Sequence, residues 1–100
     1  MAVYLITSCD ITDPDKYAPY VPNILPILDK YGAEIIAGDK NAITVDGEER
    51  DLTVVIKFPS AETLTELIED PEYTPWMAIR LASTTNRATV IVGEFDASTF

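Results

Sequence analysis

Stretches rich in β-branched and aromatic residues mark the expected strands of this chain. The longest are residues 2–10, 52–58 and 87–95, and each has the length and composition of a strand. Shorter apolar runs at 33–37 and 42–46 predict two further strands, the second closing on an Asp-Gly turn signal. The pattern therefore predicts five strands, of which 52–58 is the strongest.

Between these strands, apolar residues recur at the three- and four-residue spacing of a helix. One such stripe runs from Tyr17 to Tyr31, opened by Thr12-Asp13-Pro14 and ended by Gly32. Three prolines interrupt it, at Pro19, Pro22 and Pro26. Because each proline removes a backbone donor and crowds the preceding turn, we expect a helix that is kinked or broken in its first half.

Two more helices are expected between residues 59 and 83. Ser60 is placed to cap a helix over 60–68, and Asp70-Pro71 has the composition of a helix start for residues 70–83. The apolar stripe of this last helix includes one charged residue; its members are Tyr73, Trp76, Met77, Arg80 and Leu81. A guanidinium in such a stripe needs either an internal carboxylate, Asp10 or Glu34, or an anionic ligand.

The order of these elements predicts an α+β fold of the βαββαβ type, with an antiparallel sheet covered by helices on one face. A length of 100 residues fits a single domain over residues 1–100. Much of both faces of the strands at 2–6, 52–58 and 88–95 is apolar, although helices can cover only one face. We therefore expect a homodimer in which a second copy covers the other sheet face.

Composition narrows the possible partners and the compartment. The net charge of −10 opposes binding to nucleic acid or to anionic membranes, and no apolar run is long enough to span a membrane. Cys9 is the single cysteine, so no internal disulfide can form, and a reducing cytoplasm is the expected location.

The sequence lacks the residues of several common catalytic centres. There is no His, which excludes the usual triads and the common zinc sites. The four glycines match no phosphate-binding loop or dinucleotide fingerprint, so no cofactor is predicted. The acidic residues at 46–51 form an expected solvated loop, and no metal site is predicted.

Candidate ligand-binding residues come from the stripe of residues 70–83 and from the first strand and helix: Arg80, Tyr73, Trp76, Asp10, Tyr17 and Ser8. Ser8 and Asp10 continue the strand face of Tyr4 and Ile6, which we expect to point inward. The alternative for Asp10 is a structural one, in which its carboxylate caps the turn at Thr12-Asp13. No catalytic residue can be named.

The chain resembles the bacterial domain of unknown function 1330 family over nearly its whole length. The stretches that carry the resemblance are Tyr4-Leu5-Ile6, Asp10–Pro14 with Tyr17, Lys30–Ala33, Val54–Ser60, Asp70–Tyr73 with Arg80, and Val90–Glu94. The resemblance implies a ferredoxin-like fold in the dimeric α+β barrel superfamily. Relatives in that superfamily include cofactor-free monooxygenases, dehalogenating enzymes, decarboxylases and ligand-sensing domains, so the fold implies a pocket and not a reaction.

The sequence leaves three functions open. The first is a dimer that binds a small organic ligand, acidic or neutral, in a pocket between sheet and helices, with or without cofactor-free chemistry. The second is a non-catalytic module, either a ligand sensor or a stress-related accessory protein. The third is a structural dimer whose apolar stripes only fill a core. An enclosed cavity at Arg80 separates the first two from the third.

Overall fold

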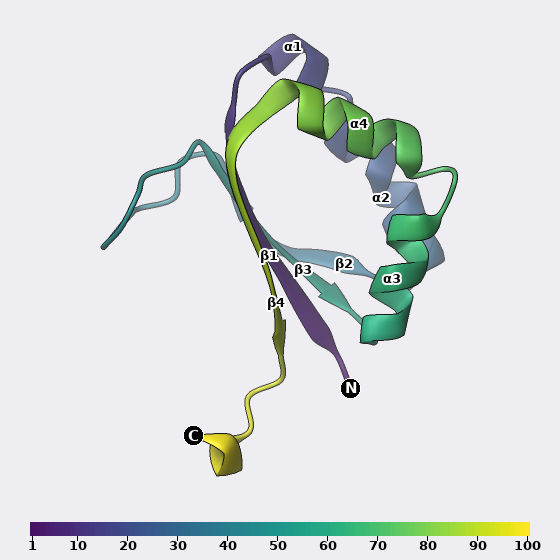
Figure 1. Ribbon diagram of the computed structural model, residues 1–100, viewed down its shortest axis with the longest axis vertical. Coiled ribbons are helices and arrows are strands. Elements are labelled where there is room, and N and C mark those ends of the chain that lie inside the picture. The colour runs from purple at the N-terminus through teal and green to yellow at the C-terminus, as the bar shows by residue number, and fades with distance from the viewer.

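The computed structural model describes residues 1–100, arranged as one antiparallel sheet with all four main helices on one of its faces (Figure 1). The strands are β1 (Val3–Ile11), β2 (Glu34–Asp39), β3 (Leu52–Phe58) and β4 (Thr84–Gly93), in the spatial order β2-β3-β1-β4. The helices are α1 (Pro14–Tyr17), α2 (Tyr20–Lys30), α3 (Ala61–Glu69) and α4 (Thr74–Ser83), and a short 3-10 turn, η1 (Ala97–Thr99), follows β4. This topology is ferredoxin-like, which confirms the predicted fold class.

The predicted helix over residues 14–31 is broken in its first half, as its prolines require. Asp13 caps α1 by accepting a hydrogen bond from the backbone N–H of Lys16, and Pro14 occupies the first helical position. Pro19 stands at the cap position of α2, where its missing donor costs little, and Pro26 lies inside that helix. The break separates Tyr17 on α1 from Tyr20 on α2, and both side chains are buried.

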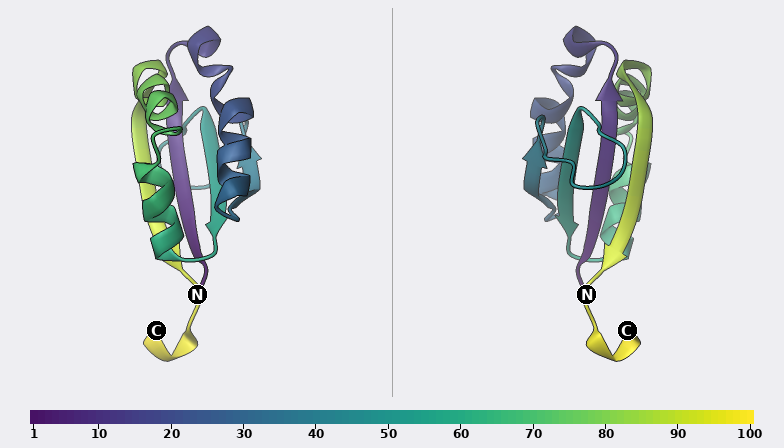
Figure 2. Two further views of the ribbon diagram at one scale, coloured as in Figure 1. Left: turned by 90° about the vertical axis from the view of Figure 1, so that its right-hand side faces the viewer. Right: turned by 90° about the vertical axis from the view of Figure 1, so that its left-hand side faces the viewer.

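The expected strand over 42–46 was wrong. These residues belong to the loop between β2 and β3, and Ile43 and Val45 are 91% and 94% exposed. Their alternation has the period of a strand, but β2 is an edge strand that pairs only with β3, so no neighbour is available. Figures 1 and 2 show this loop on the side of the sheet opposite the helices.

The base of this loop is more ordered than a simple solvated tip. The backbone N–H of Asp51 donates to the carboxylate of Asp10, and Asp51 in turn accepts from the backbone N–H of Ile11. The amide of Asn86 donates to Asp10 and to Glu48. These bonds connect the end of the loop to the adjoining ends of β1 and β4.

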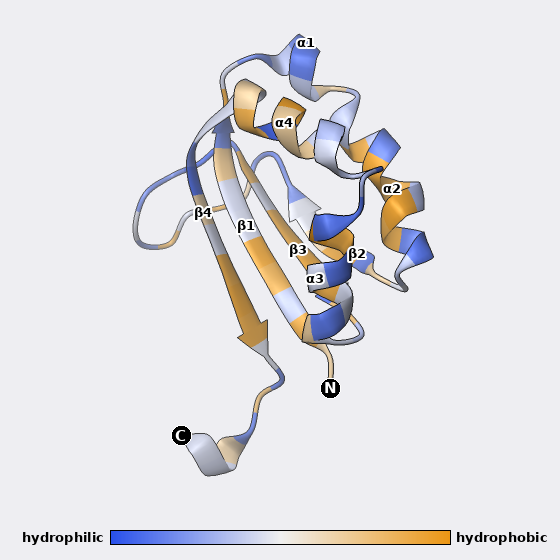
Figure 3. Ribbon diagram, turned by 45° about the vertical axis from the view of Figure 1, so that its right-hand side comes forward, coloured by the Kyte–Doolittle hydropathy of each residue, from blue (hydrophilic) through white to orange (hydrophobic).

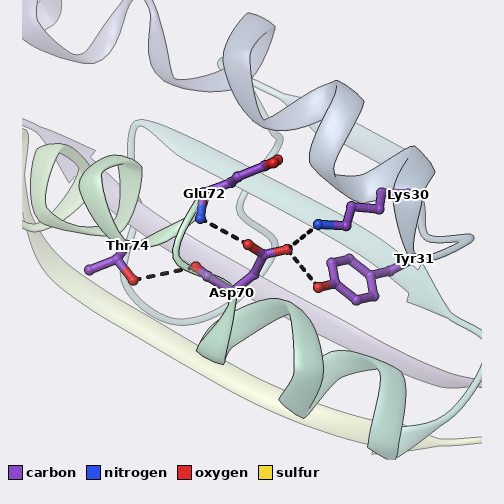
Figure 4. A network of polar contacts seen from close by, with 5 residues as sticks. All are labelled: Lys30, Tyr31, Asp70, Glu72 and Thr74. Carbon is purple, nitrogen blue, oxygen red and sulfur yellow. Dashed lines mark hydrogen bonds and ion pairs between the residues drawn. The ribbon is translucent and has the colours of Figure 1, made fainter.

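The start of α4 also differs from expectation. Asp70 does not open this helix, because it stands at the C-terminal cap of α3 and α4 begins at Thr74. Its carboxylate accepts hydrogen bonds from Lys30 Nζ at 2.8 Å and from the hydroxyl of Tyr31 at 2.6 Å (Figure 4). The backbone N–H of Glu72 donates to its other oxygen at 2.8 Å. Asp70 thus connects the α3–α4 corner to the end of α2.

The last strand begins three residues earlier than predicted. β4 starts at Thr84, immediately after α4 ends, and its pairing with β1 begins at Thr84 opposite Ile11. It ends at Gly93, so Glu94 and Phe95 lie beyond it. β2 likewise continues through Gly38 to Asp39, beyond its predicted end at residue 37.

Each sheet face has a distinct environment. The inner face, toward the helices, carries every second residue of β1: Val3, Leu5, Thr7 and Cys9. Opposite them on β3 lie Phe58, Ile56, Val54 and Leu52. The outer face carries Tyr4, Ile6, Val55, Val90 and Val92. No helix covers this outer face, and Val90 and Val92 remain 54% and 44% exposed. Figure 3 shows the hydrophobic runs along β1, β3 and β4.

Candidate functional site

An apolar cavity of about 160 Å³ lies between the inner sheet face and the helices. Its walls include Leu5, Ile24, Leu28, Ile56, Phe58 and Leu64, drawn from two strands and two helices. The register of β1 against β3 places Cys9 beside Leu52 and Val3 beside Phe58. Cys9 and Phe58 therefore line opposite ends of the cavity along the strand direction.

Arg80 is the one charged side chain that lines this cavity. Of the two alternatives for Arg80, the internal ion pair is absent: the two ion pairs of the structure are Lys30–Asp70 and Arg50–Glu48. Asp10 is occupied with Asp51 and Asn86, and Glu34 is exposed on the edge strand. Every fully buried polar side-chain atom of the structure has a hydrogen-bond partner. The guanidinium of Arg80 has none, so it is not fully buried and borders accessible space.

Arg80 is half-buried because of where it lies on α4. Tyr73, Met77 and Arg80 follow one another at spacings of four and three residues, so one side of the helix presents all of them to the cavity. The other two arginines differ from Arg80 because their guanidinium groups donate to backbone carbonyls. Arg87 donates to the carbonyl of Thr84 at 2.7 Å, and Arg50 donates to the carbonyl of Asn86 at 2.9 Å.

Tyr17 supplies a second polar group at the same end of the cavity. The residue is 7% exposed. Its hydroxyl has no hydrogen-bond partner in the protein and keeps some contact with accessible space. Burial raises the pKa of Tyr17 to about 12, although the nearby charge of Arg80 opposes the rise. At neutral pH the hydroxyl is therefore protonated and able to donate a hydrogen bond to a guest in the cavity.

Cys9 lines the cavity beside these groups. Burial raises the pKa of its thiol, which the positive charge of Arg80 partly offsets. The thiol is therefore protonated near neutral pH and behaves as a small apolar group with a weak donor.

Tyr73 and Tyr20 form a closed pair on the cavity wall. Their hydroxyls lie 2.8 Å apart and hydrogen-bond each other, and both residues are buried. The ring of Tyr20 also stacks on that of Tyr17 with centroids 5.4 Å apart. Burial, together with the neighbouring Tyr73, raises the pKa of Tyr20 far above its ordinary value. Neither hydroxyl is free to serve as a base.

The structure brings together only part of the predicted set. Arg80, Tyr73 and Tyr17 line the cavity, whereas Trp76 packs against the outside of the core cluster. The expectation that Ser8 and Asp10 point inward was wrong, because their strand face is turned away from the helices. Both alternating faces of the first strand are apolar, so the pattern could not identify the inner one.

Asp10 also does not cap the turn at Thr12-Asp13. The backbone N–H groups of both residues donate instead to the carbonyl of Ser83, at 2.9 and 3.2 Å. The structural role of Asp10 is to hold Asp51 and Asn86 at the base of the β2–β3 loop.

Sequence reasoning missed Cys9 and Tyr20 as cavity residues. The signal for Cys9 was its alternation with Leu5 and Thr7, and for Tyr20 its place three residues after Tyr17. The structure places no group of three or more Asp, Glu or Cys side chains where a metal ion could be held. None of the helices has the length and hydropathy needed to cross a membrane.

Solved structures similar to this chain share its fold at low sequence identity. A protein of unknown function from Rhodopseudomonas palustris has a TM-score of 0.84 and 16% identity, covering 95% of this chain and 83% of that one. A dimeric ferredoxin-like protein of unknown function from Jannaschia sp. CCS1 has a TM-score of 0.76 and 10% identity, covering 94% and 100%. SnoaB, a cofactor-independent oxygenase from Streptomyces nogalater, has a TM-score of 0.67 and 8% identity, covering 96% and 95%.

No curated protein matches the chain. A family model gives an assignment more specific than the shared fold. The model matches residues 2–95, which include every strand and the four main helices. The match confirms the resemblance drawn from the residues between Tyr4 and Glu94. The chain belongs to the family described as Domain of unknown function (DUF1330).

Proposed function

We propose that this protein is a homodimer that binds a small organic acid in the cavity between sheet and helices, with Arg80 receiving the carboxylate. The observation that carries the proposal is Arg80 itself, a permanent charge that lines an apolar cavity without an internal partner. An unpaired guanidinium beside apolar walls attracts an anion more strongly than one surrounded by bulk water. Its planar fork also matches the two oxygens of a carboxylate.

Binding fits the cavity better than base catalysis does. No carboxylate and no His line the cavity, so an acid-base reaction would have to use Tyr17 or Cys9. The pKa values of both groups are raised, which keeps them protonated at neutral pH. A cavity without a ready base favours a ligand-binding module over an enzyme that abstracts a proton.

The outer sheet face supports the homodimer. It carries apolar side chains at Tyr4, Ile6, Val55, Val90 and Val92, and no helix of the chain covers them. A second copy of the same face would bury this surface, as a stable isologous interface requires. The similar fold from Jannaschia sp. CCS1 is described as dimeric. A single unpaired cysteine fits a reducing compartment, and we place the dimer in the cytoplasm as part of the proposal.

The test is calorimetric titration of monocarboxylic acids of varied size into the wild type and into Arg80→Met. Methionine keeps much of the length and apolar volume of the arginine stem and removes the guanidinium. We expect at least one acid to bind the wild type and the variant to lose about tenfold or more of that affinity, the value of a charge-assisted bond.

Lys16→Met is the matched control, since it removes one positive charge from an exposed position on α1. It should bind the same acid as the wild type does. If no acid binds, or if Arg80→Met binds as tightly as Lys16→Met, the ligand-binding function is wrong.

A further inference from the structure

The cavity is polar at one end and apolar at the other. The polar groups without partners come from Tyr17 and Arg80, with the thiol of Cys9 beside them. The opposite end is made by Phe58, Leu64 and neighbouring aliphatic side chains. Cys9 and Val3, the latter paired with Phe58, are six residues apart on β1, which corresponds to roughly 20 Å of strand. A guest bound to these donors therefore meets apolar side chains in the direction of Phe58.

The volume sets the size of the apolar part. The cavity measures about 160 Å³. An apolar protein cavity of about 150 Å³, lined by similar side chains, accommodates one benzene molecule. A fused pair of rings would have to displace packed side chains, and a bare acetate would leave most of this volume unfilled.

From these observations we propose, building on the binding function above, that the ligands are monocarboxylic acids whose body is one six-membered ring. The carboxylate accepts from the guanidinium of Arg80 and from the hydroxyl of Tyr17. The ring lies against the apolar lining nearest these two groups, which includes Leu52, Val54 and Met77. A second carboxylate is excluded, because it would be buried among these apolar groups without a donor.

Tyr17 supplies the second donor to the carboxylate, beside Arg80. Its hydroxyl is the one tyrosine hydroxyl of the cavity that no other side chain occupies, since those of Tyr20 and Tyr73 bond each other. A pKa near 12 keeps its proton in place as a donor throughout the physiological range. Tyr17→Phe removes this donor without breaking any bond within the protein.

Calorimetric titration with five acids on the full chain tests this class. Benzoate and cyclohexanecarboxylate have one ring, 1-naphthoate has two, acetate has none, and succinate carries a second charge. We expect the two single-ring acids to bind at least about tenfold more tightly than acetate, because burying a ring removes apolar surface from water. Succinate and 1-naphthoate should bind at least about tenfold more weakly than benzoate.

Variants then separate the two proposals. Tyr17→Phe should weaken benzoate about tenfold and leave the binding of toluene, a neutral ring without a hydrogen-bond acceptor, unchanged. Circular dichroism and the melting temperature of the unliganded variant verify that it folds. Lys16→Met again serves as the control for charge.

Each outcome bears on a different statement. If acetate or succinate binds as tightly as benzoate, and Arg80→Met abolishes that binding, the ligand class is wrong and the function stands. Tighter binding of 1-naphthoate than of benzoate also overturns the class. If Tyr17→Phe binds benzoate as tightly as the wild type, the role of Tyr17 is wrong. If none of the acids binds, the proposed function itself fails.

Discussion

The hydroxyls of Tyr20 and Tyr73 lie 2.8 Å apart and satisfy each other at the cavity wall. This bond joins α2 to the residue that precedes α4, and it therefore fixes the helix that carries Arg80 relative to the helix that carries Leu28. Because both residues are buried, removing one hydroxyl would leave the other without a partner and would lower the free energy of unfolding.

A double-mutant cycle should reveal this coupling. Tyr73→Phe leaves the Tyr20 hydroxyl without its partner, and we expect a loss of about 1–3 kcal/mol in the free energy of unfolding. Adding Tyr20→Phe removes the stranded hydroxyl, so the double variant should be less destabilised than the sum of the singles. Urea denaturation measures all four proteins. Additive effects would show that the two hydroxyls do not depend on each other.

Asp70 should make stability depend on pH in the acid range. Hydrogen bonds from Lys30, Tyr31 and the backbone of Glu72 lower the pKa of its carboxyl to about 2, below its ordinary value of 3.8. A lowered pKa in the folded state stabilises the protein above the unfolded value, and this stabilisation is lost as pH falls through the folded value.

Asp70→Asn should therefore lower the melting temperature most at neutral pH. The difference from the wild type should shrink as pH falls from about 4 toward 2, since the wild type loses its charged carboxylate over that interval. Melting curves recorded across the range measure this. Asp46→Asn is the control, because Asp46 is an exposed carboxyl in the β2–β3 loop. A difference that stays constant with pH would contradict the charged role of Asp70.

Val90→Asp should convert the proposed homodimer into a monomer. Val90 lies on the outer sheet face, and in an interface of about 2,000 Å² or more its replacement would bury an unpaired charge. Light scattering on a sizing column measures the mass. Leu25→Asp, on the exposed side of α2, introduces the same charge away from this face and should leave the dimer intact. A monomeric wild type, or a dimeric Val90→Asp, would contradict the interface.

Arg80→Met should change the stability of the empty protein little. Arg80 has no ion pair to lose, so we expect the free energy of unfolding to stay within about 0.5–1 kcal/mol of the wild type. Breaking a buried ion pair would cost about 3–5 kcal/mol. Arg87→Met provides the contrast, because Arg87 donates to Thr84 at the end of α4 and should be the more damaging change. A larger loss from Arg80→Met would show a structural role for Arg80.

Local patterns in the sequence determined the four strands that form, the caps of α1 and α3, and the fold class. The run from Leu52 to Phe58 forms β3 with the predicted bounds, and Ser60 caps α3 by accepting from the backbone N–H of Thr63. The prolines break the first helical region, because a missing donor acts on its own turn whatever the rest of the chain does. Helical spacing also placed Tyr73 and Arg80 on one side of α4, since the period of a helix is local.

Only the tertiary structure decided which face of β1 meets the helices and which partner each polar group finds. Cys9 points into the cavity and Asp10 away from it, although both faces of the first strand are apolar and a shift of one residue exchanges them. Asp70 bonds Lys30 and Tyr31, about 40 residues earlier in the chain, instead of opening α4. Arg80 remains without a partner because the fold directs Asp10 to the loop base. Such pairings depend on long-range packing, which residue spacing along the chain does not contain.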